Sequence, residues 1–373
     1  MKHISTWNDE QDFFRRIDEM KTIMIPEPGK VMMTETEMPE VKQGEALLKI
    51  LYGGICGSDL GTYRGTFAYA GYPRIPGHEF SAQIVKIGEN DRGLKEGMIV
   101  TCNPYFNCQK CYSCERGLVN CCESNETLGA QRDGAFSEYI TMPVERIYDG
   151  KGLSPKSLAL IEPFCISYHG VSRSDIQKGD KVLVIGAGTI GVLAAVAAKA
   201  KGGEVYIADI AEEKLQYAYH TFGLTGMIKN DSEENFANRV REITGDHHGF
   251  DVCIEAVGLP STFQNCIDAA AFGGRVVLIG VGKKNLDFNF TMIQKKELDI
   301  LGSRNALKAD FTELIDLVKG GAIDLEKIVM NPGSEDPTKK SEYELDEAEA
   351  AFKEFSQYGG SKLKVLIHFA DPE

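Results

Sequence analysis

The chain has 373 residues, with 41 Lys and Arg against 55 Asp and Glu, which gives a formal net charge of −14 at pH 7. That length fits two or three domains, and 43% of hydrophobic residues is enough to build their cores. An acidic chain repels phosphate backbones and anionic membrane surfaces. The composition therefore argues against nucleic acid or a membrane as a partner and favours a soluble protein.

The N-terminal segment MKHISTWNDEQDFFRRIDEM carries charges of both signs and has no uninterrupted apolar run, so it does not resemble a secretory signal. We expect a cytoplasmic protein whose ten cysteines face a reducing environment. Residues 1–19 are interpreted as an extension without assigned function, because MKTIMIPEPGKV, from Met20, is typical of a chain start. The uncharged stretch 182–198 is slightly short for a membrane span and contains three glycines, so it predicts a buried strand that leads into a helix.

Residues 20–165 contain short strand patterns separated by Gly- and Pro-rich turns, as in EALLKILYGGICG, PRIPGHEFSAQIVKIGEN and GAFSEYITMP. This pattern is typical of a mainly β domain. From residue 166 onward, apolar strands alternate with helices, which predicts a parallel sheet covered on both faces. The expected strands are KVLVIGAG (181–188), EVYIAD (204–209), a short one near 226–229, FDVCIEAVG (250–258), RVVLIGVG (275–282) and ELDILGSR (297–304). After residue 306, two amphipathic helical stretches precede the strand KLKVLIHFA.

A glycine-rich turn follows the first of these strands. Gly186, Gly188 and Gly191 form the pattern GAGTIG before an Ala-rich helix. The first glycine permits a tight turn, the second lets the backbone approach a pyrophosphate, and the third lets helix and strand pack closely. The helix N-terminus then presents N–H groups to the phosphates. The turn predicts a dinucleotide site, although a glycine-punctuated core turn would have the same three residues.

Asp209 ends the next expected strand, about 20 residues after Gly186, where a carboxylate accepts hydrogen bonds from ribose hydroxyls. Its charge would repel a 2′-phosphate, so Asp209 favours NAD over NADP. The alternative is that Asp209 caps the following helix. Lys214, one helical turn further on, either reaches the adenosine ribose or is a solvated surface lysine.

Four cysteines stand at short intervals in the pattern Cys108-x2-Cys111-x2-Cys114-x7-Cys122. Two-residue gaps let a tight loop place sulfurs tetrahedrally around zinc, and a site closed by four thiolates is structural. Cys121 competes for the fourth position on spacing alone. A reducing compartment disfavours disulfides between these residues.

A second set of metal-binding residue types is dispersed along the chain. It comprises Cys56 in GICGSD, His78 and Glu79 in PGHEF, and Glu162 in LIEPF. Each alone has a structural explanation: a buried thiol, a core histidine or a carboxylate at a helix start. Together they supply one sulfur, one nitrogen and one or two carboxylates, which is what an open catalytic zinc requires. Spacing alone does not decide between these interpretations.

With these motifs, the chain resembles the zinc-dependent medium-chain dehydrogenases over essentially all of residues 20–373. The resemblance rests on GICGSD, PGHE, the four-cysteine pattern, the Glu-Pro pair of LIEPF, and GAGTIG with its acidic residue. It implies an α/β protein with a GroES-like, mainly β catalytic domain over 20–165 and a doubly wound Rossmann NAD-binding domain over 166–305. It further implies that a C-terminal segment, 306–373, returns to the catalytic domain. The implied activity is zinc- and NAD-dependent oxidation of CH–OH groups.

The resemblance also implies the site residues. Cys56, His78 and either Glu79 or Glu162 bind the catalytic zinc; in the polyol-dehydrogenase branch a glutamate stands at the position of Glu162, and the choice stays open. Besides Asp209, Lys214 and the glycine-rich turn, the residues implied to bind the cofactor are Ile190, Ile279, Gly280, Val281, Ser303 and Arg304.

One part of the family's proton relay is missing. Ser58 looks like the hydroxyl that hydrogen-bonds the substrate oxygen and passes its proton toward the ribose, and Asp59 looks like the carboxylate that orients His78. Many relatives complete the relay with a histidine three residues after that serine, where this chain has Gly61. The proton must then leave through water, Tyr63 or another group. The departure weakens an interpretation as a threonine dehydrogenase.

Three segments bear on the substrate: EPFCISYHGV, TLGAQRDGAFSEY and GSRNA (302–306). They most resemble the sugar-acid dehydrogenases that oxidise the C5 hydroxyl of L-galactonate or L-gulonate to a ketone. Galactitol-phosphate and sorbitol dehydrogenases are close seconds. An anionic substrate requires a cation, and Arg304 and Arg132 are candidates, unless Arg304 contacts only the cofactor. We expect a small polyhydroxy acid or polyol, oxidised at a secondary alcohol.

Two other classes share parts of this pattern. A zinc- and NAD-binding redox sensor without turnover would not need the dispersed ligand set together with Ser58, and a zinc-free quinone reductase of the same fold lacks those ligands. The resemblance also implies a homodimer or homotetramer. Relatives join two Rossmann sheets edge to edge, near the segments RVVLIGVG and GVGKKNLDFNFT of this chain.

Overall fold

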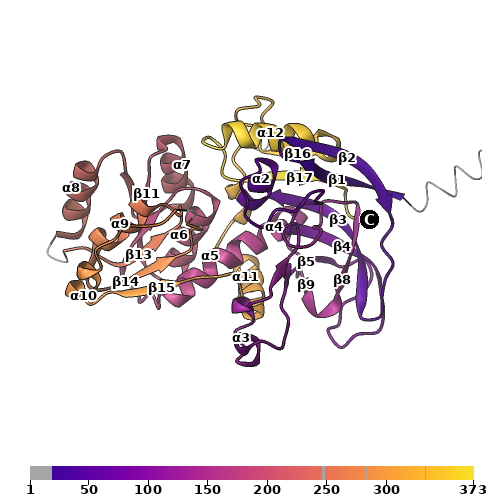
Figure 1. The fold of residues 1–373 in the computed structure, drawn as a ribbon, viewed down its shortest axis with the longest axis horizontal. Coiled ribbons are helices and arrows are strands. Elements are labelled where there is room, and N and C mark those ends of the chain that lie inside the picture. Colours follow the sequence, from indigo (N-terminus) through magenta and orange to yellow (C-terminus); the bar gives the residue numbers. More distant parts are fainter. Residues whose placement is uncertain (1–18, 246–247, 283, 332) are drawn as a thin grey trace, which may run out of the picture.

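The computed structural model describes residues 19–245, 248–282, 284–331 and 333–373. The expected N-terminal extension therefore lies outside the described residues, apart from Glu19, which begins the first strand. Two sheets form the two halves of the molecule, and they lie side by side in Figure 1.

The first sheet is mainly antiparallel and has seven strands, in the order β16-β17-β3-β4-β5-β9, with β8 also paired to β3. Its strands are β3 (Glu45–Ile55), β4 (Glu79–Ile87), β5 (Ile99–Cys102), β8 (Tyr139–Pro143), β9 (Ile147–Asp149), β16 (Glu342–Glu344) and β17 (Val365–His368). Two small ribbons accompany it, β1 (Glu19–Glu27) with β2 (Lys30–Glu37), and β6 (Tyr105–Phe106) with β7 (Glu126–Thr127). The mainly β architecture expected for this half is confirmed.

Short helices border this sheet: α2 (Gly57–Tyr63), α3 (Tyr112–Glu115), α4 (Pro155–Ala159) and α12 (Ala348–Tyr358). β16, β17 and α12 come from the C-terminal part of the chain. β17 runs antiparallel to β3, with Val365 opposite Ile55, and α12 packs on β2 and α2. This pairing brings residues near 364 next to residues near 55, far from them in sequence.

The second sheet has six parallel strands in the order β12-β11-β10-β13-β14-β15. They are β10 (Lys181–Ile185), β11 (Glu204–Asp209), β12 (Gly226–Lys229), β13 (Phe250–Glu255), β14 (Ala270–Leu278) and β15 (Asp299–Gly302). The helices around it are α6 (Thr189–Ala200), α7 (Glu212–Phe222), α8 (Glu233–Thr244), α9 (Pro260–Ala269) and α10 (Thr291–Lys296). The doubly wound parallel sheet is confirmed. β14 begins before the predicted position, because its first residues pair irregularly with β13.

The uncharged stretch 182–198 forms the buried strand β10 and most of helix α6, as predicted. Among the described residues, no helix is long and apolar enough to cross a membrane. β10 lies between β11 and β13, so the chain leaves it in opposite directions on the two sides. In open parallel sheets, ligands bind in the crevice that this reversal opens at the carboxyl ends of the strands.

Helix α5 (Ile161–Arg173) lies between the two sheets (Figure 1). It packs against α6 and against α11 (Lys308–Lys319) on the side of the parallel sheet, and it also contacts β4 and β5 of the other sheet. The helix therefore carries residue 162 toward the first sheet and residue 169 toward the second half of the molecule.

Candidate active site and metal centres

Four cysteines converge in a lobe formed by residues 108–122, which we call the zinc lobe. The sulfur atoms of Cys108, Cys111, Cys114 and Cys122 lie within 4.8 Å of one another. The Cys108 backbone N–H donates to Cys122 Sγ at 3.2 Å. Cys121 is exposed while Cys122 is buried, so the choice that spacing left open falls to Cys122.

The chemistry of this donor set fits zinc. Backbone N–H groups of Glu123 and Cys114 lower the pKa of the Cys111 thiol to about 6, and the N–H of Lys110 lowers the pKa of Cys108. Burial instead raises the pKa of Cys114 to about 12. The backbone of the loop therefore favours the thiolate form of two of the four cysteines even without a metal. Four sulfur ligands fill the coordination sphere of a zinc ion and leave no position for a substrate. This is a structural zinc site.

The second cluster, which we call the open cluster, brings together Cys56, His78 and Glu79, whose ligand atoms lie within 4.8 Å of one another. Cys56 precedes helix α2 directly after β3, and His78 precedes β4, whose first residue is Glu79. Because β3 and β4 are paired, with Gly54 opposite Glu79, the ends of both strands deliver their ligands to one point. One sulfur, one nitrogen and one carboxylate make up the donor set of a catalytic zinc.

The electrostatics of the open cluster also fit a bound cation. Burial disfavours protonation of His78, but Cys56 and Asp59 outweigh burial and raise the pKa of the imidazole well above its ordinary value. His78 Nδ1 is buried and makes no hydrogen bond within the described chain. A buried pocket with this excess of negative charge and an unused ring nitrogen is suited to a divalent metal.

Glu162, at the start of α5, is buried next to the open cluster but does not belong to the group of mutually close ligand atoms. The Tyr105 hydroxyl donates a hydrogen bond to its carboxylate. Burial, together with the carboxylate of Glu79, raises the pKa of Glu162 to about 7 against the opposing charge of His78. The structure thus has Glu79 among the three converging ligand atoms and Glu162 outside that group, but close enough to interact with the charges of His78 and Glu79.

Lys364 is the cation of the open cluster. Its side chain is 3% exposed, and its Nζ lies 2.5 Å from the Glu79 carboxylate, which is 1% exposed. Nζ also donates to the Ile55 carbonyl at 3.2 Å. Burial alone would lower the pKa of Lys364, but Glu79 and Cys56 outweigh it and raise that pKa, so the ammonium persists. One oxygen of Glu79 is therefore neutralised by Lys364, which directly precedes β17, the strand paired with β3.

Asp59 acts on the backbone of both ligand segments. Its carboxylate accepts from the Cys56 N–H at 2.9 Å and from the Gly77 N–H at 3.1 Å. The distance from its oxygen to His78 Nδ1 is 3.9 Å, which is too long for the hydrogen bond expected from the sequence. Asp59 thus fixes the backbone of Cys56 and of Gly77, which precedes His78, and lies near the imidazole without a hydrogen bond to it. Ser58 lies half-buried in the first turn of α2, two residues after Cys56.

Gly61 stands at the position of the relay histidine expected from the family resemblance, and it is closely packed. A Cβ at this position would lie 3.1 Å from Phe67 Cβ, because the turn after α2 folds back and donates two N–H groups to the Gly61 carbonyl. Tyr63, the alternative proton exit, packs its ring against Phe352 of α12 at 6.0 Å between centroids.

The glycine-rich turn has the geometry of a phosphate cradle. Gly186 has φ +112°, and a Cβ on Gly191 would meet the Gly186 carbonyl oxygen at 1.8 Å, so no side chain is accepted there. A Cβ on Gly188 would instead meet nothing within 4 Å in the part of the chain that the structure describes. The backbone at Gly188, the N-cap of α6, is therefore open to a ligand that approaches the helix N-terminus.

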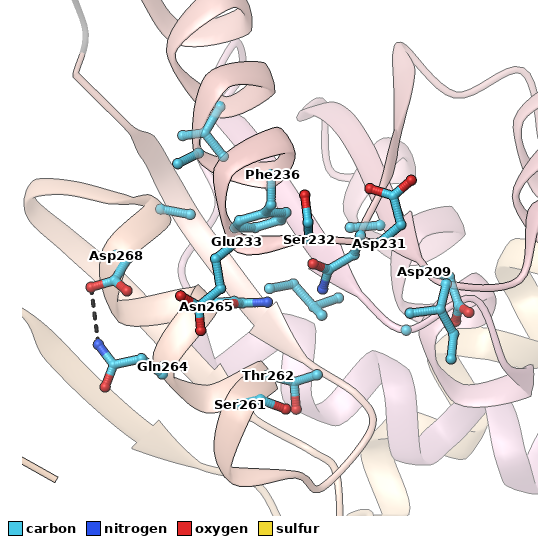
Figure 2. Close-up of a pocket in the computed structure, with 18 of the residues that line it drawn as sticks. Asp209, Asp231, Ser232, Glu233, Phe236, Ser261, Thr262, Gln264, Asn265 and Asp268 are labelled. Atoms are coloured by element: carbon cyan, nitrogen blue, oxygen red, sulfur yellow. Dashed lines mark hydrogen bonds between the residues drawn. The ribbon is translucent and has the colours of Figure 1, made fainter.

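Asp209 ends β11 beside this turn. It accepts from the Ala187 N–H at 2.6 Å and from the Ala211 N–H at 2.8 Å, so it ties the glycine-rich turn to the start of α7. It also lines a pocket of about 960 Å³ that continues between α8 and α9. Figure 2 shows the carboxylates of Asp231 and Glu233 on the same pocket. These three carboxylates thus line this pocket, together with Arg241.

A second cleft, of about 490 Å³, joins the two halves of the molecule. It is lined by Cys56 and Glu79 of the open cluster and by Gly188, Ile190 and Lys214 of the parallel-sheet domain. Burial lowers the pKa of Lys214. The open cluster and the glycine-rich turn therefore face the same space, with a cation beside it.

The remaining predicted cofactor residues lie at the ends of β14 and β15. Ile279 is buried against Gly170 of α5. The contact is so close that a Cβ on Gly170 would lie 2.5 Å from the Ile279 side chain. Gly280 leaves no room for a side chain, since a Cβ would lie 2.3 Å from the Gly258 nitrogen. Val281 is 79% exposed.

Ser303 and the two candidate arginines differ in what they contact. The Ser303 hydroxyl is buried and has no hydrogen-bond partner among the described residues, while the Arg304 side chain is exposed. Arg132 is stacked on Phe106, with its guanidinium 3.8 Å from the ring centroid, and lies near Glu126. Arg304 is therefore freer than Arg132 to meet a ligand.

Sequence reasoning missed three buried residues that organise the site: Tyr105, Lys364 and Glu255. Glu255 accepts from the N–H groups of Val257 and Gly258 at the end of β13. A lysine and a glutamate in apolar strand sequences carry a weak signal, since a charge in a core must have a partner. The sequence does not show which partner it has.

Comparisons with known proteins agree with this geometry. Residues 42–151 match the family model "Alcohol dehydrogenase GroES-like domain", and residues 189–320 match "Zinc-binding dehydrogenase". The chain is 38% identical to L-galactonate-5-dehydrogenase of Escherichia coli K12 over 82% of this chain and 88% of that protein. It is 31% identical to a sorbitol dehydrogenase of Halalkalibacterium halodurans over 93% and 99% of the two chains.

A solved structure of an alcohol dehydrogenase from Escherichia coli CFT073, complexed with NADH, covers 94% of this chain and 100% of its own, with a TM-score of 0.83 and 29% identity. These likenesses extend over both domains and over both metal clusters. The chain therefore belongs to the zinc-binding alcohol dehydrogenases of the medium-chain type, enzymes that act on CH–OH groups with zinc and NAD(P).

Proposed function

We propose that the protein is an NAD-linked dehydrogenase that oxidises a secondary hydroxyl of a sugar acid of the L-galactonate or L-gulonate type, at C5, to the ketone. The observation that carries this is the shared cleft, lined by Cys56 and Glu79 on one side and by Gly188 and Ile190 on the other. A hydroxyl beside the open cluster and a nicotinamide dinucleotide on the glycine-rich turn would meet there.

When bound, zinc supplies Lewis acidity toward the substrate hydroxyl, and NAD supplies a hydride acceptor. The other tasks belong to the chain itself. Cys56, His78 and Glu79 hold the metal, while Asp59 fixes the backbone of the first two segments. Ser58 Oγ would accept the hydroxyl proton while it passes its own proton toward the ribose of the cofactor. Because Gly61 stands in place of the relay histidine, the proton would then leave through water, Tyr63 or another group.

The two buried carboxylates, Glu79 and Glu162, have different partners and different roles. Lys364 pairs with one oxygen of Glu79, so that part of this buried negative charge is balanced by the chain itself. Tyr105 holds Glu162 by a hydrogen bond, so that this carboxylate stays beside the reacting hydroxyl as a direct or water-mediated ligand.

Two observations support the sugar acid as substrate. The relative L-galactonate-5-dehydrogenase is 38% identical to this chain, and the exposed side chain of Arg304, next to the expected nicotinamide pocket, offers a cation to a carboxylate. The sorbitol dehydrogenase relative supports a neutral polyol as the second candidate. The global charge of −14 opposes an anionic substrate, so the local arginine has to supply the attraction.

We also propose NAD, not NADP, as the cofactor, because the carboxylates of Asp209, Asp231 and Glu233 line the pocket that would receive an adenosine 2′-phosphate. The domain limits 20–165, 166–305 and 306–373, and the location in the cytoplasm, are part of the same proposal. So is a homodimer or homotetramer, formed at the edge of the parallel sheet, where β15 is the last strand and Val281 and Phe290 are exposed.

A substrate panel tests the proposal. NADH formation is followed at 340 nm with hexonates, polyols, polyol phosphates, L-threonine and primary aliphatic alcohols, each with NAD and with NADP. We expect the highest kcat/KM with L-galactonate or L-gulonate and NAD. The highest value with sorbitol or galactitol phosphate would move the assignment to the polyols, and turnover of primary alcohols alone would contradict it.

A further inference from the structure

A buried polar chain connects the zinc lobe with the parallel-sheet domain, outside both metal clusters. It consists of Asn120, His169 and Asp310, which are 5%, 7% and 6% exposed. Asn120 belongs to the short helix η1 (Val119–Cys121) of the zinc lobe. His169 lies on α5 and Asp310 in the first turn of α11, so three separate elements meet in these side chains.

The hydrogen bonds among these three side chains all run in one direction, from donor to acceptor. Asn120 Nδ2 lies 3.0 Å from the Arg304 carbonyl oxygen and 3.1 Å from His169 Nε2. A carbonyl only accepts, so the amide nitrogen must face both groups, and His169 Nε2 must be the acceptor. The ring proton then lies on Nδ1 and is donated to the Asp310 carboxylate at 3.0 Å.

The same three side chains hold a loop at both ends of that loop. Arg304 is held through its carbonyl by Asn120, and the Leu307 N–H donates to the Asp310 carboxylate at 2.7 Å. Asn305, between Arg304 and Leu307, has φ +50°, and its side-chain amide donates to the backbone carbonyl of Asn120 at 3.4 Å. We call residues 303–307 the cofactor loop and the three buried side chains the latch. The latch fixes the backbone of the loop while the Arg304 side chain stays exposed.

Asn120 owes its position to the metal ligands around it. It lies between Cys114 and Cys122, and the backbone N–H of Cys122 closes the turn onto Val119. Fixing these cysteines fixes the amide of Asn120. We propose that Asn120, with His169 behind it, is a positioning residue through which the zinc lobe orders the cofactor loop. The consequence for cofactor affinity rests on the proposed role of Ser303 and Arg304 at the nicotinamide.

The test compares Asn120→Ala and Asn120→Asp in the zinc-loaded enzyme with the matched control Asn125→Ala. Asn125 lies shortly after the lobe, and among the described residues its amide donates to Thr127, close by in sequence. Asn120→Asp keeps the shape but puts an acceptor where a donor is needed. Hydrogen exchange of the amides of residues 303–307, the dissociation constant for NADH, kcat and zinc content are measured for each protein.

Both Asn120 variants should raise the exchange rate of the loop amides about tenfold and weaken NADH binding about five- to tenfold, the equivalent of one lost hydrogen bond. Zinc content and kcat at saturating NAD should change little, and Asn125→Ala should match the wild type. His169→Ala removes the contribution of α5 to the latch and leaves every residue of the zinc lobe in place, and should loosen the same amides.

Unchanged exchange of the loop in Asn120→Ala and in His169→Ala would overturn the proposal, and so would equal effects in Asn125→Ala. If the loop amides loosen while the NADH dissociation constant stays constant, the latch is upheld and the cofactor role of Ser303 and Arg304 is wrong. Loss of the Cys111 ligand supplies an independent check. Cys111→Ser, with one zinc fewer, should loosen the loop as strongly as Asn120→Ala does.

Discussion

The two metal clusters of this protein are built in opposite ways. The zinc lobe takes all four ligands from residues 108–122, while the open cluster takes ligands from the ends of β3 and β4 and its nearby charges from α5 and the segment before β17. Backbone N–H groups in the lobe and of Glu123, directly after it, lower the pKa of two of its thiols. The open cluster is buried and depends on distant partners to balance its charge.

This difference indicates how each site is held in place. A local cluster needs a correct loop and its metal, whereas a dispersed cluster needs the correct sheet. Lys364 illustrates the point, because the pairing of β17 with β3 is what carries its ammonium to Glu79. The consequences of substitution should therefore differ in size and in kind between the two regions.

The largest effect on stability is expected from Lys364→Met. It leaves one oxygen of the buried Glu79 carboxylate without its ammonium partner, which should cost about 3–5 kcal/mol of unfolding free energy. Urea unfolding, followed by circular dichroism on the zinc-loaded protein, measures it. The control is Lys30→Met, whose exposed pair with Glu27 should contribute less than about 1 kcal/mol. Equal losses would show that the open cluster does not depend on its distant partner.

A smaller effect is expected from Tyr105→Phe, which removes the hydrogen bond to Glu162. A hydrogen bond to a charged group contributes about 1.5–3 kcal/mol, so kcat/KM should fall about 10- to 100-fold. Steady-state kinetics on the best substrate of the panel measure this change. Tyr69→Phe, at an exposed position, should leave kcat/KM unchanged. An unaltered Tyr105→Phe enzyme would mean that Glu162 takes no part in the reaction.

On the cofactor side, Asp209→Asn tests the acidic lining of the pocket. Removing the charge should narrow the preference for NAD over NADP by about tenfold, because one repulsion of the 2′-phosphate, of the order of 1.4 kcal/mol, is lost. Ratios of kcat/KM with the two cofactors give the value. The affinity for NAD should also fall somewhat, since Asp209 anchors the Ala187 and Ala211 N–H groups. A constant ratio would place the selectivity elsewhere.

The smallest effect is expected in the zinc lobe from Cys121→Ser. Its thiol is exposed and lies outside the four converging sulfurs. Zinc content, measured by plasma mass spectrometry, should remain at two per chain, and stability should change by less than about 0.5 kcal/mol. Cys122→Ser should lose one zinc. The reverse pattern would exchange the roles of the two cysteines.

The same contrast explains what the sequence predicted. The zinc lobe could be predicted from spacing alone, because its ligands are neighbours in the chain, and the parallel sheet could be predicted from its apolar strands and the glycine-rich turn. Spacing alone did not decide whether Cys56, His78 and Glu79 form one metal site or have separate structural roles. The family resemblance was needed to favour the metal site. Lys364, Tyr105 and the latch were not predicted, because each contact joins elements more than 40 residues apart through tertiary packing. Asp59 was predicted as a carboxylate near His78, but its backbone contacts were not.

The central claim is that the open cluster binds a catalytic zinc and the lobe a structural one. Zinc content and turnover, measured together on the wild type, Cys56→Ala and Cys111→Ala, test it most directly. We predict two zinc ions per chain in the wild type and about one in each variant. Cys56→Ala should keep NADH binding and lose about three orders of magnitude in turnover, while Cys111→Ala should keep much of its turnover. Full activity in Cys56→Ala, or two zinc ions bound to it, would contradict the account.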